Sequence, residues 1–203
     1  MRLFFLLLIL NSCNGQNTTS KETKSKIKQD TIMEIFDIKQ YEERKKQGTT
    51  TFVLENGNEV KQLETEPKDL NDKRYIEYIT PNYPELFYIY KEFYYNGHIK
   101  EYGKRFKNGY FQKGLWHYYE NGVLEKSIDY DKSYTFTWEQ IKKYCLDNRI
   151  KIELNTTRIS RDNSNSKPVW TISWFYGSAM FKEVKINGQT GEFIEQKLIP
   201  AKK

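Results

Sequence analysis

The pattern of apolar and polar positions divides the chain into five stretches of different character. An apolar run comes first, and a polar stretch with one large apolar residue, Ile27, follows it. Next comes a segment with short β-prone runs, then a segment rich in aromatic residues, and finally a segment in which one amphipathic helix precedes several strands. The predicted boundaries are 1–12 for a signal peptide, 13–34 for a tether, 35–80 for a short helix and a β-hairpin, 81–132 for aromatic hairpins, and 133–203 for an α+β domain.

Residues 3–10 are all apolar and follow the basic residue Arg2. Eight residues match the apolar region of a signal peptide and are far short of the roughly 20 that span a bilayer. The sequence Leu10-Asn11-Ser12-Cys13 resembles the lipobox of bacterial lipoproteins, and the sequence CNGQ that starts at Cys13 is similar to lipoproteins of the Bacteroidota. This resemblance implies lipidation at Cys13, with an ordinary secretory signal as the alternative. Two or three acyl chains anchor a protein stably where one does not.

Residues 14–30 are too polar to bury a core, so a flexible tether is expected there. Asp37 can cap a short helix that ends before Gly48. The Asn56-Gly57 pair predicts a hairpin, because both positions of its turn favour positive φ. Residues 67–74 are interpreted as a linker and residues 79–85 as an extended entry segment.

An internal repeat then dominates the chain. Residues 93–106 and 117–130 share an aromatic run, an Asn-Gly pair and an aliphatic residue, with equivalent positions 25 residues apart. Such a period predicts stacked supersecondary units. Each copy predicts one β-hairpin with its turn at the Asn-Gly pair. A further pair, Asn108-Gly109, predicts a turn between the two copies, and Gly114 can provide a bend. The predicted turn residues are Asn96, Gly97, Asn108, Gly109, Asn121 and Gly122.

Residues 88–131 resemble bacterial MORN-variant repeats, which share the pattern aromatic-aromatic-x-Asn-Gly-x-aliphatic. The resemblance implies single-layer stacked hairpins that serve as interaction surfaces, as in family members that are antitoxin-like or immunity proteins. It transfers no catalytic residue to this chain.

The last segment predicts one helix followed by antiparallel strands. Thr137 and Gln140 form a capping box, and Trp138, Ile141 and Cys145 make one apolar helix stripe. In residues 169–175, alternation places Trp170 and Ile172 on a buried face. The predicted strands are 149–159, 169–176, 181–186 and 192–199. The fold class predicted for the whole chain is mainly β or α+β: stacked hairpins, then a helix packed on an antiparallel sheet.

Residues 137–196 also resemble the PepSY-like domains of bacterial envelope proteins. The similarity rests on the order of the elements and on a closing turn, Asn187-Gly188-Gln189-Thr190-Gly191-Glu192, that precedes an aliphatic strand. The resemblance implies inhibition of another protein or accessory binding.

Composition narrows the possible functions. The net charge is +6, or +5 once Arg2 is removed with the signal peptide, and charges of both signs alternate along the chain. No basic stripe stands out, so nucleic acid is not an expected partner. Two Cys and two His exclude a disulfide framework and a multi-histidine metal site.

Candidate chemistry is sparse. His98 and His117 are too few for a structural zinc site, and no Gly-x-Ser-x-Gly elbow is present. Cys145 lies on the apolar helix stripe, so a packing role is expected. Asp129 begins a pattern similar to a calcium loop, but the sixth position is Tyr134, where the loop needs glycine. We therefore expect no catalytic residue, no metal and no cofactor.

The aromatic residues carry the functional hypothesis. Most of the 16 tyrosines lie in or beside the repeat. They can be core and cross-strand pairs, or they can form a binding surface, since tyrosine and tryptophan are enriched in binding hot spots. The candidate binding residues are Tyr94, Tyr95, Trp116, Tyr118 and Tyr119.

The sequence therefore predicts a non-catalytic lipoprotein of the cell envelope, anchored through Cys13, with the outer membrane favoured over the inner. The first hypothesis is a protein-binding module, such as an immunity or antitoxin-like protein. The alternative is an inhibitor or accessory factor of an envelope enzyme that acts through the C-terminal domain, and a hydrolase is the least favoured. The sequence does not identify the partner or the oligomeric state.

Overall fold

The computed structural model describes residues 34–66, 68–69, 72–82, 85–109, 111–164 and 167–201. These residues belong to one compact unit. The predicted signal peptide, Cys13 and most of the predicted tether lie outside the described residues. None of the described helices is long and apolar enough to cross a membrane.

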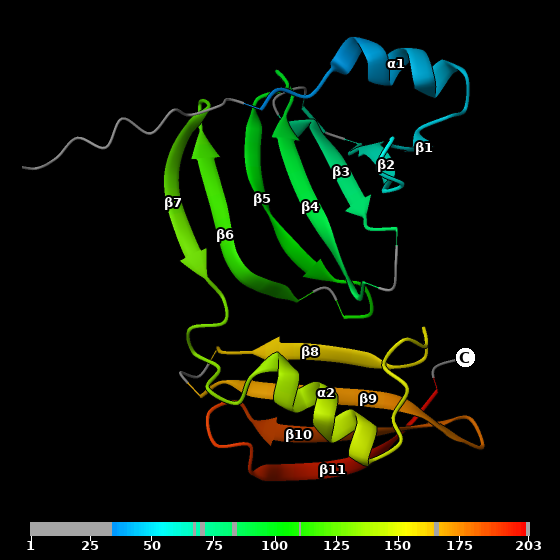
Figure 1. Cartoon of the computed structure of the whole chain (residues 1–203), viewed down its shortest axis with the longest axis vertical. Helices are drawn as coiled ribbons and strands as arrows, with labels where there is room; N and C mark the ends of the chain where they lie inside the picture. The colour runs from blue at the N-terminus through cyan, green and yellow to red at the C-terminus, as the bar shows by residue number, and fades with distance from the viewer. Residues whose placement is uncertain are drawn as a thin grey trace, which may run out of the picture. The chain divides into compact units, whose positions relative to one another are not determined.

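Two antiparallel sheets and two helices build the described part (Figure 1). The first sheet is a seven-stranded meander in the order β1 to β7, and the second has the order β11-β10-β9-β8. This confirms the predicted mainly β and α+β fold class. The elements are α1 (Ile38–Lys46), β1 (Thr51–Val53), β2 (Glu59–Glu64), β3 (Arg74–Thr80), β4 (Phe87–Tyr94), β5 (Ile99–Phe106), β6 (Gln112–Glu120), β7 (Val123–Asp129), α2 (Trp138–Asp147), β8 (Arg158–Asp162), β9 (Val169–Gly177), β10 (Met180–Asn187) and β11 (Phe193–Pro200).

Helix α1 covers part of one face of the seven-stranded sheet. The Asp37 side chain accepts a hydrogen bond from the backbone of Gln40 at the start of the helix, and Gly48 follows its end at φ +69°. Phe36 and Tyr41 pack with Tyr75 of β3 and with residues of β4 and β5. We call the sheet face that α1 covers the helix face.

The two copies of the repeat form the predicted hairpins. Strands β4 and β5 turn at Asn96-Gly97, and β6 and β7 turn at Asn121-Gly122. Asn121 and Gly122 have φ of 50° and 79°, the positive values that such a turn requires. The Tyr94 hydroxyl donates a hydrogen bond to the backbone oxygen of Tyr119 at 3.1 Å, so equivalent positions of the two copies are in contact.

Strand β3 is an element that the sequence analysis did not predict. It lies between β2 and β4, so the hairpin at Asn56-Gly57 belongs to the same sheet as the repeats. Arg74, interpreted as the end of a linker, begins this strand, and Ile79, interpreted as part of an entry segment, pairs with Ile89 of β4. Apolar residues occupy both faces of β3, so its sequence lacks the alternation that marks a half-exposed strand.

The second sheet carries α2 on one face (Figure 1). The Thr137 backbone N–H donates to Gln140 Oε1 at 2.8 Å, as the capping box predicts. Trp170 and Ile172 are buried against the helix, as the alternation in β9 predicts. The predicted strand 149–159 is wrong over most of its length: residues 149–157 form turns, and β8 begins at Arg158. Ile150 and Ile152 pack instead in the core of the second sheet.

One hydrophobic core joins the two sheets. Phe87, Phe106 and Phe111 come from the first sheet or its β5–β6 connection, and they contact Trp138 of α2 or Trp170 of β9. In that connection, the Asn108 carbonyl accepts a hydrogen bond from the Ile159 backbone, and a Cβ at Gly109 would lie 1.7 Å from the Ile159 oxygen. The β5–β6 turn therefore docks directly on β8, and only glycine fits at position 109.

Candidate functional site

The five aromatic residues predicted as a binding surface do not share one face of the sheet. Trp116 and Tyr118 belong to a cluster with Tyr88 and Tyr90 on the face opposite the helix face. Tyr119 packs with the α1 cluster on the helix face, Tyr94 is tied to the Tyr119 backbone, and Tyr95 is exposed at the β4–β5 turn. We call the face that carries Trp116 the cluster face.

The cluster face is largely a core of its own. Trp116 is 0% exposed, and its ring would collide with a Cβ at Gly103, 2.4 Å away. The Tyr118 hydroxyl lies 2.7 Å from the Tyr130 hydroxyl, and burial, assisted by this hydrogen bond, raises the pKa of Tyr118. The Arg105 guanidinium stacks over Tyr90 at 3.9 Å. Rings and guanidinium cover one another, so Tyr88, Tyr90 and Trp116 are buried.

The helix face is open over part of β4, β5 and β6. A groove of about 310 Å³ lies there, and most of its lining is apolar. We call it the helix-face groove. Its lining residues come from β4, β5 and β6: Ile89, Tyr102, Gly103, Lys104, Lys113, Gly114 and Leu115.

A bulge in β6 shapes this groove. Lys104 pairs with Lys113 and Tyr102 pairs with His117, so β6 has two more residues than β5 between these pairs. Gly114 lies within the bulge at φ +64°, a conformation that glycine adopts without strain. The next residue, Leu115, is 53% exposed. The bulge therefore presents a large apolar side chain to solvent beside the groove.

A row of rings borders the groove. Tyr102 stacks on His117 at 4.8 Å between ring centroids and on Tyr119 at 6.1 Å, and all three side chains are half-buried. His117 Nδ1 lies 2.9 Å from the Ser127 hydroxyl. Half-buried aromatic rings with polar ends are typical of protein-binding surfaces.

The groove also carries positive charge. Lys104 is exposed, and the Lys113 amine lies 5.3 Å from the centre of the Phe87 ring. Burial lowers the pKa of Lys113 because it disfavours the charged amine. An acidic group bound in the groove would offset this cost.

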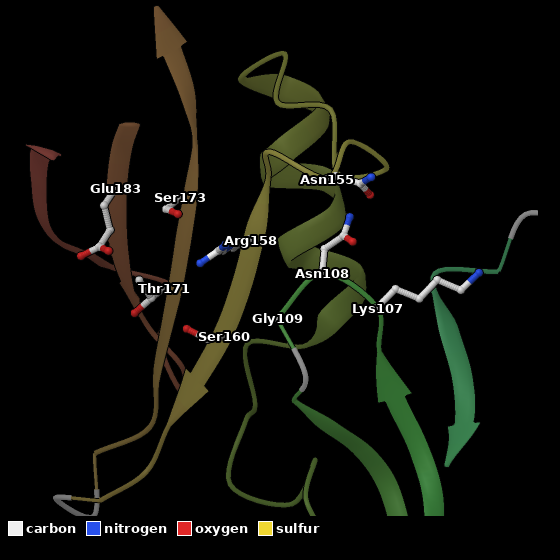
Figure 2. A pocket seen from close by; sticks show the side chains of 9 residues that line it. All are labelled: Lys107, Asn108, Gly109, Asn155, Arg158, Ser160, Thr171, Ser173 and Glu183. Carbon is white, nitrogen blue, oxygen red and sulfur yellow. The ribbon is translucent and has the colours of Figure 1, made fainter. Parts of the chain in front are cut away.

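A second, more polar groove of about 580 Å³ lies at the β8 edge of the second sheet. Figure 2 shows Arg158, Ser160, Thr171 and Ser173 on β8 and β9. Lys107, Asn108 and Asn155 lie on the other side of β8 in this view. The Asn108 amide donates to the Leu154 oxygen at 3.1 Å, so it has a structural role. Arg158 is exposed, and its charge is available to a ligand.

In the second groove, Ser173 on β9 lies opposite Glu183 on β10. No residue that lines either groove is His or Cys, and the one lining carboxylate, Glu183, pairs with Lys197 at 2.9 Å. The described residues contain no group of three or more His, Cys, Asp or Glu placed to hold a metal ion. The residues that line these grooves offer hydrogen bonding, apolar contact and charge attraction.

The remaining candidate residues, Cys145 and the two histidines, lie in packed or hydrogen-bonded parts of the fold. Cys145 is buried in the core, and burial raises the pKa of its thiol to about 12, so the reactive thiolate is scarce at neutral pH. His98 pairs through its backbone with Ile35, and its Nδ1 is buried. His117 is in the ring row, so the two histidines serve different parts of the sheet.

Comparison with known proteins adds no family assignment. No protein-family model, no curated protein and no solved structure matches this chain. The resemblances to MORN-variant repeats and to PepSY-like domains remain predictions from the sequence.

The sequence analysis missed Tyr102, Leu115 and Lys113 as site residues. One sequence feature could have identified two of these site residues. Lys113, Leu115 and His117 are spaced two residues apart, which places their side chains on one side of a strand. The placement of Tyr102 opposite His117 depends on the β6 bulge, which the spacing does not reveal.

Proposed function

We propose that this chain is a non-catalytic, lipid-anchored protein of the cell envelope that binds a protein partner through the helix-face groove. The observation that supports this function is an open part of the helix face, on which exposed Leu115 lies beside stacked rings and two lysines. Aromatic and aliphatic anchors surrounded by polar groups are the usual composition of a protein interface.

The charge of the groove favours an acidic partner segment. Lys104 and Lys113 face each other on neighbouring strands and line the groove together. A segment with one large apolar side chain and a nearby carboxylate would contact Leu115 and offset both lysines. An immunity or antitoxin-like role, which the repeat resemblance implies, would use such a surface to hold one specific protein.

Leu115→Asp is expected to reduce the amount of captured partner at least about tenfold, because it places a carboxylate where the groove offers an apolar contact. The measurement is quantitative mass spectrometry of proteins captured from detergent-solubilised membranes. Val123→Asp is the matched control, since Val123 is 66% exposed but lies at the start of β7, outside the groove. A partner lost equally from both variants would contradict this site.

The lipobox resemblance supports an anchor at Cys13, with the outer membrane favoured. Cys13→Ala is expected to move the protein from the membrane fraction to the soluble fraction and to abolish incorporation of labelled palmitate, because the lipid acceptor is lost. Cys145→Ala is the control and should retain the label, since Cys145 is buried in the core. Labelling of Cys13→Ala would refute lipidation at this residue.

The polar groove supports a second candidate function, an inhibitor or accessory factor that acts through the C-terminal domain. Arg158 and the hydroxyls of Ser160, Thr171 and Ser173 can hydrogen-bond a polar segment of an envelope enzyme. Deleting residues 137–203 would not separate the two functions, because it would expose Phe87, Phe106 and Phe111. Arg158→Glu separates them: lost binding favours the polar groove, and retained binding together with the loss in Leu115→Asp favours the helix-face groove.

A further inference from the structure

Strand β11 is an edge strand with an open side. It pairs with β10 and, in the described part of the chain, with no other strand. All of its residues except Ile199 are exposed. An edge strand presents unpaired backbone N–H and C=O groups that can pair with another strand.

The sequence of β11 is complementary to itself in one antiparallel register. When Gln196 lies opposite Gln196 of a second copy, Glu195 lies opposite Lys197 of that copy, and Lys197 lies opposite its Glu195. On either side, Ile194 then faces Leu198. Phe193 lies outside this regular run, because the β10–β11 register shifts between the Lys185–Glu195 and Ile186–Phe193 pairs. Directly opposed residues lie on the same face of an antiparallel sheet and contact each other, so both the charged and the apolar pairs match.

The charges within one copy strengthen this match. Glu183 pairs with Lys197 at 2.9 Å, and Lys185 pairs with Glu195 at 2.5 Å, both between β10 and β11. When two copies join at this edge, Lys197 of one copy lies opposite Glu195 of the other. The ion pair Glu183–Lys197 of the first copy is then next to the ion pair Glu195–Lys185 of the second. The result is a row of four side chains with alternating sign, present twice by symmetry.

The registers centred on the two neighbours of Gln196 oppose like charges. Centring the pair on residue 195 places Glu195 against Glu195, and centring it on residue 197 places Lys197 against Lys197. Such pairs destabilise a strand contact. The other long exposed edge, β7, has no such pattern, because a pair centred on Lys126 places two lysines together. Of these three registers of β11, the one centred on Gln196 opposes unlike charges.

Pairing would also cover apolar surface. Phe193, Ile194 and Leu198 are exposed large apolar side chains on this one strand. In the register centred on Gln196, Ile194 gains Leu198 of the second copy as an apolar neighbour, and Leu198 gains Ile194. An exposed edge strand with such residues is a common site of strand pairing between chains.

We propose that two copies of this chain associate through β11, antiparallel and centred on Gln196. The two four-stranded sheets then form one continuous eight-stranded sheet. The occupant of the β11 edge is a second copy of this chain, and the helix-face groove on the other sheet stays available for a different partner.

Charge reversal tests this pairing. In sedimentation velocity of the full lipidated chain in detergent, wild type is expected to be dimeric. Glu195→Lys and Lys197→Glu should each weaken the dimer by roughly tenfold or more, because each creates two like-charge pairs. An equimolar mixture of the two variants should form a heterodimer, since all its opposed pairs at these positions again have opposite charge. Recovery in the mixture also shows that both variants are folded.

A cysteine scan tests the register independently. Gln196→Cys is expected to give a disulfide-linked dimer under mild oxidation, because opposed residues of antiparallel strands lie at a Cα separation compatible with a disulfide. Glu195→Cys or Lys197→Cys alone should link poorly, whereas the two variants mixed should link to each other. A monomeric wild type, dimeric single charge variants, or equal linking at all three positions would overturn the proposal.

Discussion

Replacing Arg161 with alanine is expected to lower the free energy of unfolding by about 3–5 kcal/mol, because two backbone oxygens lose a charged donor worth about 1.5–3 kcal/mol each. The Arg161 side chain is 8% exposed and pairs with Asp131 at 2.6 Å. Its Nη1 also donates to the backbone oxygens of Gln112 and Tyr130, each at 3.2 Å. These partners belong to or follow the strands of the first sheet, whereas Arg161 lies in β8 of the second.

Ring contacts add to this junction. The Arg161 guanidinium lies over Phe111, Tyr134 and Trp170, at 4.3 to 4.8 Å from the ring centres. Alanine would remove these ring contacts and leave two backbone oxygens without their donor. The Asp131 carboxylate would also lose its ion pair with Arg161. Arginine is suited to this place because one planar group can stack on rings and donate hydrogen bonds at its edge.

The measurement for Arg161 is urea unfolding of the purified chain, followed by circular dichroism. Arg158→Ala is the matched control, because Arg158 lies in the same strand but is exposed, and a change within about 0.5 kcal/mol is expected there. An equal effect of the two substitutions would contradict the view that Arg161 joins the sheets.

Replacing Trp116 with alanine is expected to cost about 3–5 kcal/mol of unfolding free energy, the usual range for a fully buried aromatic side chain. Its indole Nε1 donates to the Lys104 oxygen at 3.1 Å, and its ring stacks with Tyr90 at 5.9 Å. Alanine would leave a cavity over Gly103 and a carbonyl without its donor. This result would assign Trp116 to the core, where the sequence had left a choice between core and binding surface.

The neighbour Leu115 supplies the control for Trp116. Leu115→Ala should change the unfolding free energy by no more than about 0.5 kcal/mol, since Leu115 is exposed. Gly103→Ala should be costly in wild type and much less costly in Trp116→Ala, because the added Cβ meets the indole ring. Additive costs in that double variant would show that the two positions do not contact each other.

Features that depend on neighbouring residues were predictable from the sequence. The Asn-Gly pairs predict where the hairpins turn. Positive φ at both positions, the expected reason, is found at Asn121-Gly122, whereas only the glycine has positive φ at Asn56-Gly57 and Asn96-Gly97. The capping residues Asp37 and Thr137 predict where the helices begin, because their side chains satisfy backbone groups one turn away. The alternation in β9 predicts which face of the second sheet packs on α2.

Features that depend on distant strands were not predictable. Residues 149–157 have a strand-like composition, yet two isoleucines of this stretch, Ile150 and Ile152, pack in the core from turns. Strand β3 was missed because its sequence shows no alternation of apolar and polar residues. Its residues are buried through pairing with β2 on one side and β4 on the other. In each case, contacts with distant residues outweighed local preference.

The sequence by itself determined the Asn-Gly turns, the helix starts, the 25-residue repeat and the matching charges of β11, because each is a relation between residues close in the chain. Only the tertiary structure decided that Trp116 is buried, that Tyr119 lies on the opposite face, and that a groove opens beside Leu115. The physical reason is register. A bulge of two residues in β6 changes which side chains of neighbouring strands meet, and pairing between strands is a property of the whole sheet.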